Sequence, residues 1–173
     1  AIWNPVAASI LSMLEVNREK DNEFLMMAYT SDPDELRVDN ELVVWIPPTF
    51  TAYVQTQSDL AWDQGWRTAG MLITAGAYGD NWHKNFKIYW EDHLGGTVVA
   101  EQRANYYTET DYSSQITAIL TQNPDFIVFG GPSAPTALVV EQIREMGYEG
   151  GLMLVDQPKI NYLKAVLEGL DYL

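Results

Sequence analysis

Strand-like and helix-like patterns alternate along almost the whole chain, and this alternation constrains the fold more than any other feature of the sequence. Short apolar runs that read as strands occupy residues 24–28, 42–46, 69–74, 97–100, 125–129 and 151–155. Between these runs, apolar residues recur at the spacing of a helix that buries one face. Because strands joined through helices pair in parallel, the pattern predicts an α/β fold with a doubly wound parallel sheet.

The run at residues 125–129 is the strongest support for this prediction, because every residue after Asp125 in it is apolar. A strand of that kind is typical of a parallel sheet covered by helices on both faces. We expect the strands at residues 69–74, 97–100, 126–129 and 152–155 to be neighbours in one sheet. Pro47-Pro48 is the clearest break in the pattern. It predicts a crossing between two lobes near residues 46–49.

Helix boundaries follow from capping chemistry. Asp80 and Asp111 each precede an apolar stripe and are expected to cap a helix. The helix after Asp80 should run to Gly95-Gly96, and a helix from about residue 134 should end at Gly147, because glycine is favoured just past a helix end.

The charge balance argues against several classes of partner. The chain carries 24 acidic and 10 basic residues, for a net charge of −14. Such a surface repels nucleic-acid phosphates and anionic lipid headgroups, so we expect no nucleic-acid partner. The apolar runs are too short for membrane insertion. No cysteine is present, which excludes disulfides and thiolate chemistry. No motif indicates a cofactor or a metal ion, and we expect neither.

Four loops follow predicted strands and should meet at one edge of the structure. In open α/β sheets, ligands bind beyond the carboxyl ends of the strands, where helix N-termini offer free N–H groups. The loops contain Tyr29-Thr30-Ser31, Gly76-Ala77-Tyr78-Gly79, Gly130-Gly131-Pro132-Ser133 and Asp156-Gln157. We therefore expect a ligand site at this edge.

Each candidate in these loops also has an ordinary structural interpretation. Thr30 and Ser31 offer hydroxyl donors to a carboxylate, or they cap a short helix. Tyr78 contacts a ligand, or it is a half-buried aromatic with a solvated hydroxyl. Gly130-Gly131 lets the backbone approach a ligand, or it makes a tight strand-to-helix turn. Asp156 pairs with an ammonium group, or it caps the next helix.

Catalytic signatures do not support an enzyme. Gly131-Pro132-Ser133 lies between a strand and a helix, but the second glycine of a nucleophile elbow is missing. The two histidines, His83 and His93, precede Ser133, whereas that hydrolase order needs a histidine after the serine. Their spacing also matches no standard metal pair. We expect a protein that binds a ligand without chemical conversion, and we rank an α/β enzyme below the binding functions described at the end of this section.

Several longer segments resemble the type I periplasmic binding proteins of the leucine/isoleucine/valine-binding group. The most specific are Thr110-Asp111-Tyr112-Ser113, then residues 123–131 with Pro124-Asp125 before an apolar strand that ends in glycine, and then Arg144-Glu145-Met146-Gly147. Ala77-Tyr78-Gly79 resembles the tyrosine–glycine loop of the family. Residues 28–33 resemble its hydroxyl-rich segment, although Met27-Ala28 replaces the usual Ser-Pro.

The resemblance implies roles for individual residues. Thr30 and Ser31 match the segment whose hydroxyls bind an α-carboxylate, and Tyr78 matches a ligand-contacting tyrosine. Asp156 matches an acidic residue that holds an α-amino group. Ser133 falls where members often have an aromatic contact, and Ser9 falls in a serine-rich ligand loop. The expected ligand-binding residues are thus Ser9, Thr30, Ser31, Tyr78, Ser133 and Asp156.

The resemblance also implies an organisation and a function. Members are about twice this length, so residues 1–46 would be part of the first lobe and residues 47–173 most of the second. The implied function is the substrate-binding component of an ABC transporter that captures a small amino-acid-like or related polar ligand and delivers it to a membrane permease. The implied location is periplasmic or extracellular, with a lipid anchor as one option. The main alternative is a ligand-sensing domain of a receptor or regulator.

Overall fold

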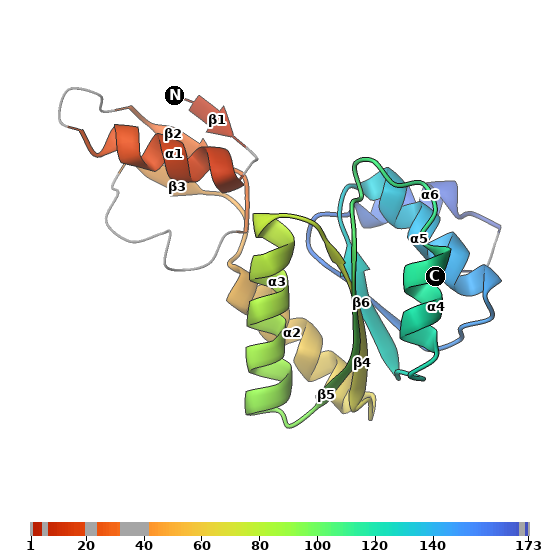
Figure 1. Ribbon diagram of the computed structural model, residues 1–173. Helices are drawn as coiled ribbons and strands as arrows, with labels where there is room; N and C mark the ends of the chain where they lie inside the picture. Colours follow the sequence, from red (N-terminus) through yellow and green to blue (C-terminus); the bar gives the residue numbers. More distant parts are fainter. Residues whose placement is uncertain (1, 5–6, 20–23, 32–41, 170–171, 173) are drawn as a thin grey trace.

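The computed structural model describes residues 2–4, 7–19, 24–31, 42–169 and 172. Its first part holds one helix and three strands, which are β1 (Ile2–Asn4), α1 (Ala7–Asn17), β2 (Met26–Ala28) and β3 (Val43–Trp45). The strands pair in parallel in the order β1-β2-β3. The helix α1 lies along one face of this sheet (Figure 1). Ile10 and Leu14 on the helix pack with Met26 and Ala28 on β2 and form a small buried core.

A second parallel sheet has four strands in the order β5-β4-β6-β7. The strands are β4 (Thr68–Thr74), β5 (Thr97–Ala104), β6 (Phe126–Gly130) and β7 (Gly151–Leu154). The four segments expected to be neighbours are therefore neighbours, and the predicted α/β class with parallel sheets is confirmed. The strand β5 extends four residues beyond the predicted end at Ala100.

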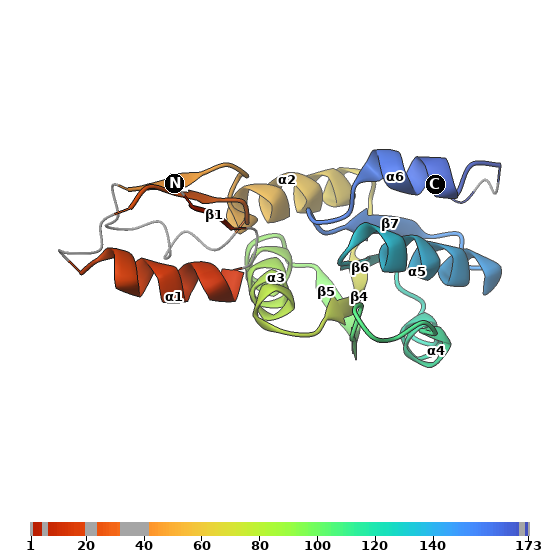
Figure 2. The same cartoon turned by 90° about the horizontal axis from the view of Figure 1, so that it is seen from above.

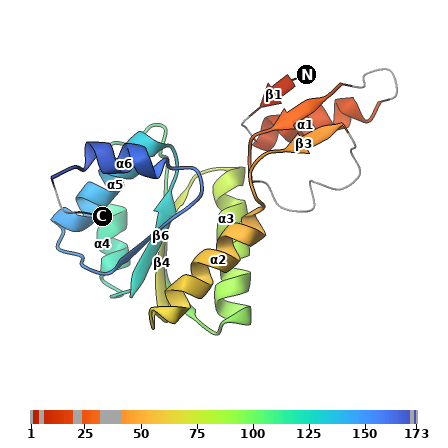
Figure 3. The same cartoon turned by 180° about the vertical axis from the view of Figure 1, so that it is seen from behind.

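Helices cover both faces of the four-stranded sheet, as Figure 2 and Figure 3 show from two directions. One face carries α2 (Phe50–Asp63), α3 (Ala77–Lys87) and the π-helix η2 (Ile88–His93). The other face carries α4 (Ser113–Leu120), α5 (Ser133–Glu145) and α6 (Ile160–Val166). Within the described part of the chain, none of the helices is long and apolar enough to cross a membrane.

The strand β6 shows why its sequence is apolar at every position. Phe126 and Val128 pack into the core under α2 and α3, whereas Ile127 and Phe129 pack into the core under α4, α5 and α6. All four side chains are buried. Successive side chains of a strand point to opposite faces, so a sheet with helices on both sides needs apolar residues throughout.

Asp125 ties the beginning of β6 to the beginning of β4. One of its carboxylate oxygens, Oδ2, accepts hydrogen bonds from the backbone N–H groups of Arg67 (2.7 Å) and Thr68 (2.8 Å) and from the Thr68 hydroxyl (2.8 Å). Partial burial opposes ionisation, but these donors outweigh it and lower the pKa of Asp125. Asp125, which the sequence placed inside the strand, therefore lies just before β6 and links it to β4 through hydrogen bonds.

The prediction that Asp80 caps a helix was wrong. The helix α3 begins at Ala77 behind Gly76, and Asp80 lies in its first turn, where its carboxylate pairs with Arg103 at 2.5 Å. Gly76 adopts a φ of 99°, which favours glycine and lets the chain enter the helix directly after β4.

The single helix expected to end at Gly95 is divided into α3 and η2, which is a π-helix. In this turn Trp90 is fully buried, and a Cβ atom on Gly96 would lie only 2.3 Å from its indole ring. Glu91 accepts a hydrogen bond from the N–H of Val98 at 3.0 Å, which ties this turn to β5.

Between the two sheets, the chain passes from Trp45 to Phe50 through Pro47 and Pro48. The Thr49 hydroxyl caps α2 by accepting a hydrogen bond from the N–H of Ala52 at 3.1 Å. The N–H of Phe50 donates to the carbonyl of Ser31 at 3.1 Å. The division into lobes at this segment stays a prediction.

Candidate functional site

A cavity of about 720 Å³ lies at the carboxyl ends of the strands. Residues that follow strands of both sheets line it, together with one tyrosine from α2. They are Tyr29, Thr30, Ser31, Ile46, Pro47, Tyr53, Ala75, Ala77, Tyr78, Tyr107, Pro132, Ser133, Asp156, Gln157 and Lys159. The cavity therefore occupies the edge at which α/β sheets bind ligands.

Asp156 is the acidic residue in this lining, and two neutral donors from α3 hold its carboxylate. The hydroxyl of Tyr78 donates to Oδ1 at 2.5 Å, and the indole Nε1–H of Trp82 donates to the same oxygen at 2.8 Å. No ion pair to Asp156 occurs in the part of the chain that the structure describes. A half-buried carboxylate with only neutral partners has no compensating charge beside it and can attract a cationic group.

The electrostatic effect of Asp156 extends to two tyrosines. Burial raises the pKa of Tyr78 well above its ordinary value, and the charge of Asp156 raises it further. Burial and Asp156 likewise raise the pKa of Tyr53. Both phenols therefore stay protonated near neutral pH, so Tyr78 remains a hydrogen-bond donor to the carboxylate.

The position of α3 places Tyr78 and Trp82 near Asp156. A Cβ atom on Gly79 would lie 1.8 Å from the carbonyl oxygen of Thr74, so only glycine lets α3 rest directly against the end of β4. The ring of Phe50 lies 5.5 Å from that of Tyr78 and 5.6 Å from that of Trp82. Phe50 is fully buried and fixes both rings from the side of α2.

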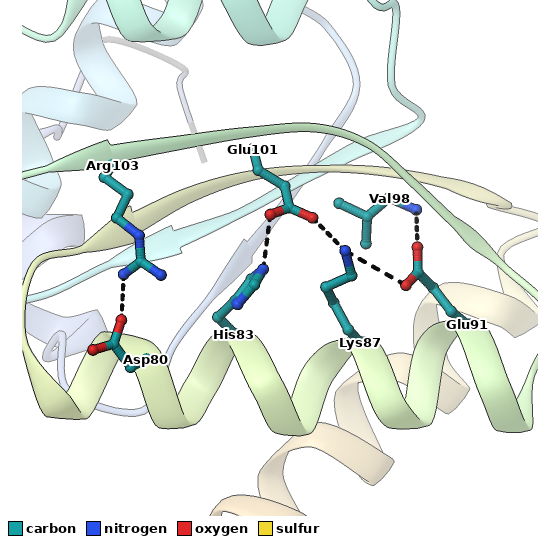
Figure 4. Close-up of polar contacts among 7 residues, drawn as sticks. All are labelled: Asp80, His83, Lys87, Glu91, Val98, Glu101 and Arg103. Atoms are coloured by element: carbon teal, nitrogen blue, oxygen red, sulfur yellow. Dashed lines mark hydrogen bonds and ion pairs between the residues drawn. The ribbon is translucent and has the colours of Figure 1, made fainter.

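On its other side, α3 is held against β5 by a row of charged contacts (Figure 4). Glu101 on β5 accepts hydrogen bonds from Lys87 at 2.5 Å and contacts Nε2 of His83 at 2.9 Å. Partial burial opposes ionisation of Glu101, but these two partners lower its pKa. The first of the two histidines thus lies in a polar contact between helix and sheet. Among the described residues, no group of three acidic or histidine side chains could hold a metal ion.

Thr30 and Ser31 enter the cavity from the end of β2, and both are buried. The hydroxyl of Ser31 is shielded from solvent and has no hydrogen-bond partner among the described residues. A buried hydroxyl without a partner costs free energy unless a ligand or water satisfies it. It is therefore suited to donate to a ligand carboxylate. Residues 32–41, which would contain a helix capped by these side chains, lie outside the described residues.

Ser133 also lines the cavity, but its hydroxyl has a structural partner. It accepts a hydrogen bond from the backbone N–H of Lys159 at 2.9 Å, which links the beginnings of α5 and α6. The N–H of Gly131 donates to Thr136 at 3.0 Å, and a Cβ atom on Gly131 would lie 3.1 Å from the ring of Tyr106. The Gly130-Gly131 pair therefore makes a packed strand-to-helix turn.

The helix-cap interpretation of Asp156 was wrong. The N-cap of α6 is Lys159, three residues further along, and no side chain caps that helix. The carboxylate of Asp156 is instead used by Tyr78 and Trp82. The structure thus brings Thr30, Ser31, Tyr78, Ser133 and Asp156 to one cavity. Ser9 is exposed on α1 and is not among the lining residues.

Sequence reasoning missed several residues of the site. Trp82 lies four residues after Tyr78, and helical spacing places both on one face, which is a usable signal. Lys159 follows Asp156 closely, and its ammonium lies 5.8 Å from the ring centre of Tyr29. Tyr53 and Tyr107 come from a helix and from the loop after β5, and neither position carries a motif.

The chain is similar to known proteins in its sequence profile and in its fold. The profile of a protein family described as "Periplasmic binding protein" matches residues 1–170. No curated protein matches the chain. Many solved structures are similar to it in fold, including three from different bacteria.

A substrate-binding periplasmic protein from Ralstonia solanacearum has a TM-score of 0.84 at 17% identity, over 100% of this chain and 48% of that one. A leucine-binding protein from Thermotoga maritima has a TM-score of 0.80 at 19% identity, over 98% and 48%. An ABC-transporter solute-binding protein from Rhodopseudomonas palustris, in complex with 4-hydroxybenzoate, has a TM-score of 0.79 at 16% identity, over 95% and 46%. The chain therefore spans less than half the length of each of these structures.

Proposed function

Because this chain belongs to the periplasmic binding protein family, we propose that it is part of the substrate-binding component of an ABC transporter. The complete protein would capture a small amino-acid-like or related polar organic ligand between two lobes. It would then present that ligand to a membrane permease. Residues 1–46 would contribute to the first lobe, and residues 47–173 would form most of the second.

The cavity at the carboxyl ends of the strands carries this proposal. Five of the six residues expected to bind the ligand line that one cavity. They follow strands of two different sheets, so a ligand held there would touch both parts of the protein. A hinged clamp works in this way, since the ligand stabilises the closed arrangement through contacts to both sides.

An amino-acid-like ligand fits the charges around the cavity. Asp156, which lacks an ion-pair partner among the described residues, would hold the ammonium group. Ser31, whose buried hydroxyl lacks a partner there, would donate to the carboxylate with Thr30 beside it. Proteins of similar fold include one described as leucine-binding and one in complex with 4-hydroxybenzoate, and for this reason the proposed ligand class includes related polar molecules.

Native mass spectrometry of the complete protein tests the proposal, because it identifies a ligand that copurifies. Calorimetric titration with L-leucine and 4-hydroxybenzoate then separates the two ligand classes. Binding of either one without turnover supports a binding protein, whereas steady conversion of any bound molecule would indicate an enzyme. Absence of a copurified small molecule, together with no binding of either probe, would contradict a ligand of this class.

The alternative is a receptor or regulator that binds a ligand and reports to a protein partner. One solved structure of similar fold is described as an extracellular ligand-binding receptor. Uptake of labelled ligand by cells with and without the gene separates the two functions, since only the transport component is needed for uptake. We propose a periplasmic or extracellular location in either case, with a lipid anchor as an option that mass spectrometry of the mature protein would detect.

A further inference from the structure

The two carboxylate oxygens of Asp156 have very different surroundings. Oδ1 accepts both the Tyr78 hydroxyl at 2.5 Å and the Trp82 indole N–H at 2.8 Å. Oδ2 has no hydrogen bond within the residues that the structure describes. A carboxylate oxygen offers about two lone-pair sites, so Oδ1 is saturated by the protein. Only Oδ2 is left for a ligand.

This asymmetry distinguishes between two kinds of organic cation. A guanidinium group pairs best with a carboxylate through two parallel N–H···O bonds, one to each oxygen. An ammonium group is a compact charge that binds well to a single oxygen. A carboxylate with one saturated oxygen therefore accommodates an ammonium group and cannot form the two-bond contact with a guanidinium group.

We propose that Trp82, acting with Tyr78, sets the cation specificity of this site by occupying Oδ1 of Asp156, so that the site accepts ammonium groups and rejects guanidinium groups. Trp82 is then a positioning residue, because it acts through Asp156 and is not itself among the residues that line the cavity. The inference rests on the proposed function in one respect, which is that a ligand enters this cavity.

The packing of Trp82 makes its N–H a fixed donor. The side chain is 2% exposed, and its ring meets Phe50 edge-on at 5.6 Å with an interplanar angle of 79°. The indole therefore cannot turn away from Asp156 without leaving the core. Tyr78, one helical turn earlier, shares the contact with Phe50.

Trp90 provides a matched control in the same core. It is also fully buried, and it also packs against aromatic neighbours, Phe86 and Phe126. Its Nε1, however, has no hydrogen-bond partner among the described residues. Trp82→Phe and Trp90→Phe both remove indole volume from this core, but only Trp82→Phe removes a donor from Asp156.

The experiment uses the complete protein and two head-group probes, methylammonium chloride and methylguanidinium chloride. Each probe is titrated while the indole N–H resonances of the tryptophans are followed by NMR. In the wild-type protein, methylammonium should move the Trp82 resonance at a concentration about tenfold lower than methylguanidinium. In Trp82→Phe, followed through the remaining indole resonances and by calorimetry, the preference should fall to about threefold or less, because Oδ1 then has a vacant site. Trp90→Phe should keep the full preference.

A second measurement does not depend on any probe or on the stability of the tryptophan variants. Asp156→Ala should shift the Trp82 indole resonance and leave that of Trp90 in place. An unshifted Trp82 resonance would overturn the inference. So would a wild-type protein that binds methylguanidinium and methylammonium with equal affinity, or one that binds neither probe. Methylammonium binding without binding of L-leucine would instead reject the amino-acid ligand and leave the cation specificity standing.

Discussion

Replacing Asp156 by asparagine and by alanine should separate two contributions of this side chain, its charge and its capacity to accept hydrogen bonds. In the structure, Oδ1 accepts hydrogen bonds from the partly buried Tyr78 hydroxyl and from the buried Trp82 indole N–H. Asparagine keeps an oxygen of the same geometry, whereas alanine leaves both donors without a partner. The two variants should therefore differ in stability, although both lose the negative charge.

The magnitudes follow from the hydrogen bonds. An unsatisfied buried donor costs about 1–3 kcal/mol, so Asp156→Ala should lower the free energy of unfolding by about 2–4 kcal/mol. Asp156→Asn should lower it by less than about 1 kcal/mol, because neutral hydrogen bonds replace charge-assisted ones. If the carboxylate pairs with an ammonium group, both variants should lose about 2–4 kcal/mol of binding free energy, which is roughly 30-fold to 1000-fold in affinity.

Urea denaturation of the two variants and the wild-type protein measures the first difference. Calorimetric titration with the ligand that copurifies measures the second. Equal stabilities of the two variants would show that Asp156 does not hold the Tyr78 and Trp82 donors. If Asp156→Asn binds the ligand as tightly as the wild-type protein, Asp156 does not pair with an ammonium group. The main electrostatic argument for an amino-acid ligand would then fail.

Three further predictions concern single residues. Ser31→Ala should lower the binding free energy of the ligand by about 1 kcal/mol, measured by calorimetry. It should leave the free energy of unfolding in urea unchanged or slightly raised, because the buried hydroxyl has no partner among the described residues. A clear loss of stability would indicate a structural role. Gly79→Ala should destabilise the protein by about 1–3 kcal/mol in urea, because the new methyl group would meet the Thr74 carbonyl, and a neutral result would contradict the close contact of α3 with β4. Asp125→Ala should cost about 1 kcal/mol at neutral pH through the loss of its hydrogen bonds to Arg67 and Thr68. Folding lowers the pKa of Asp125, so the carboxylate contributes to the free energy of unfolding above its unfolded pKa of about 4. This contribution is lost as the pH falls through the pKa of the folded protein. The difference in stability between wild type and variant should therefore shrink at low pH.

The class of fold and the location of the candidate site could be predicted from the sequence because both depend on local patterns. The unbroken apolar run of β6 required helices on both faces of a parallel sheet, and the observed packing of Phe126 and Ile127 into opposite cores confirms this. Carboxyl ends of parallel strands share one edge, so residues as distant as Thr30 and Asp156 could be assigned to the same region without knowledge of any contact.

Tertiary structure decided which side chains act together within that region. Trp82 read as one more apolar residue of a helical stripe, yet its indole N–H holds Asp156. Ser133 and Ser31 looked alike as hydroxyls after strands, but the hydroxyl of Ser133 accepts from Lys159, whereas that of Ser31 has no partner among the described residues. These outcomes depend on the rotation of α3 and on the separation of elements far apart in the chain. Sequence periodicity reports which face of an element is buried, and hydrogen bonds require distances and directions that only the packing of those faces determines.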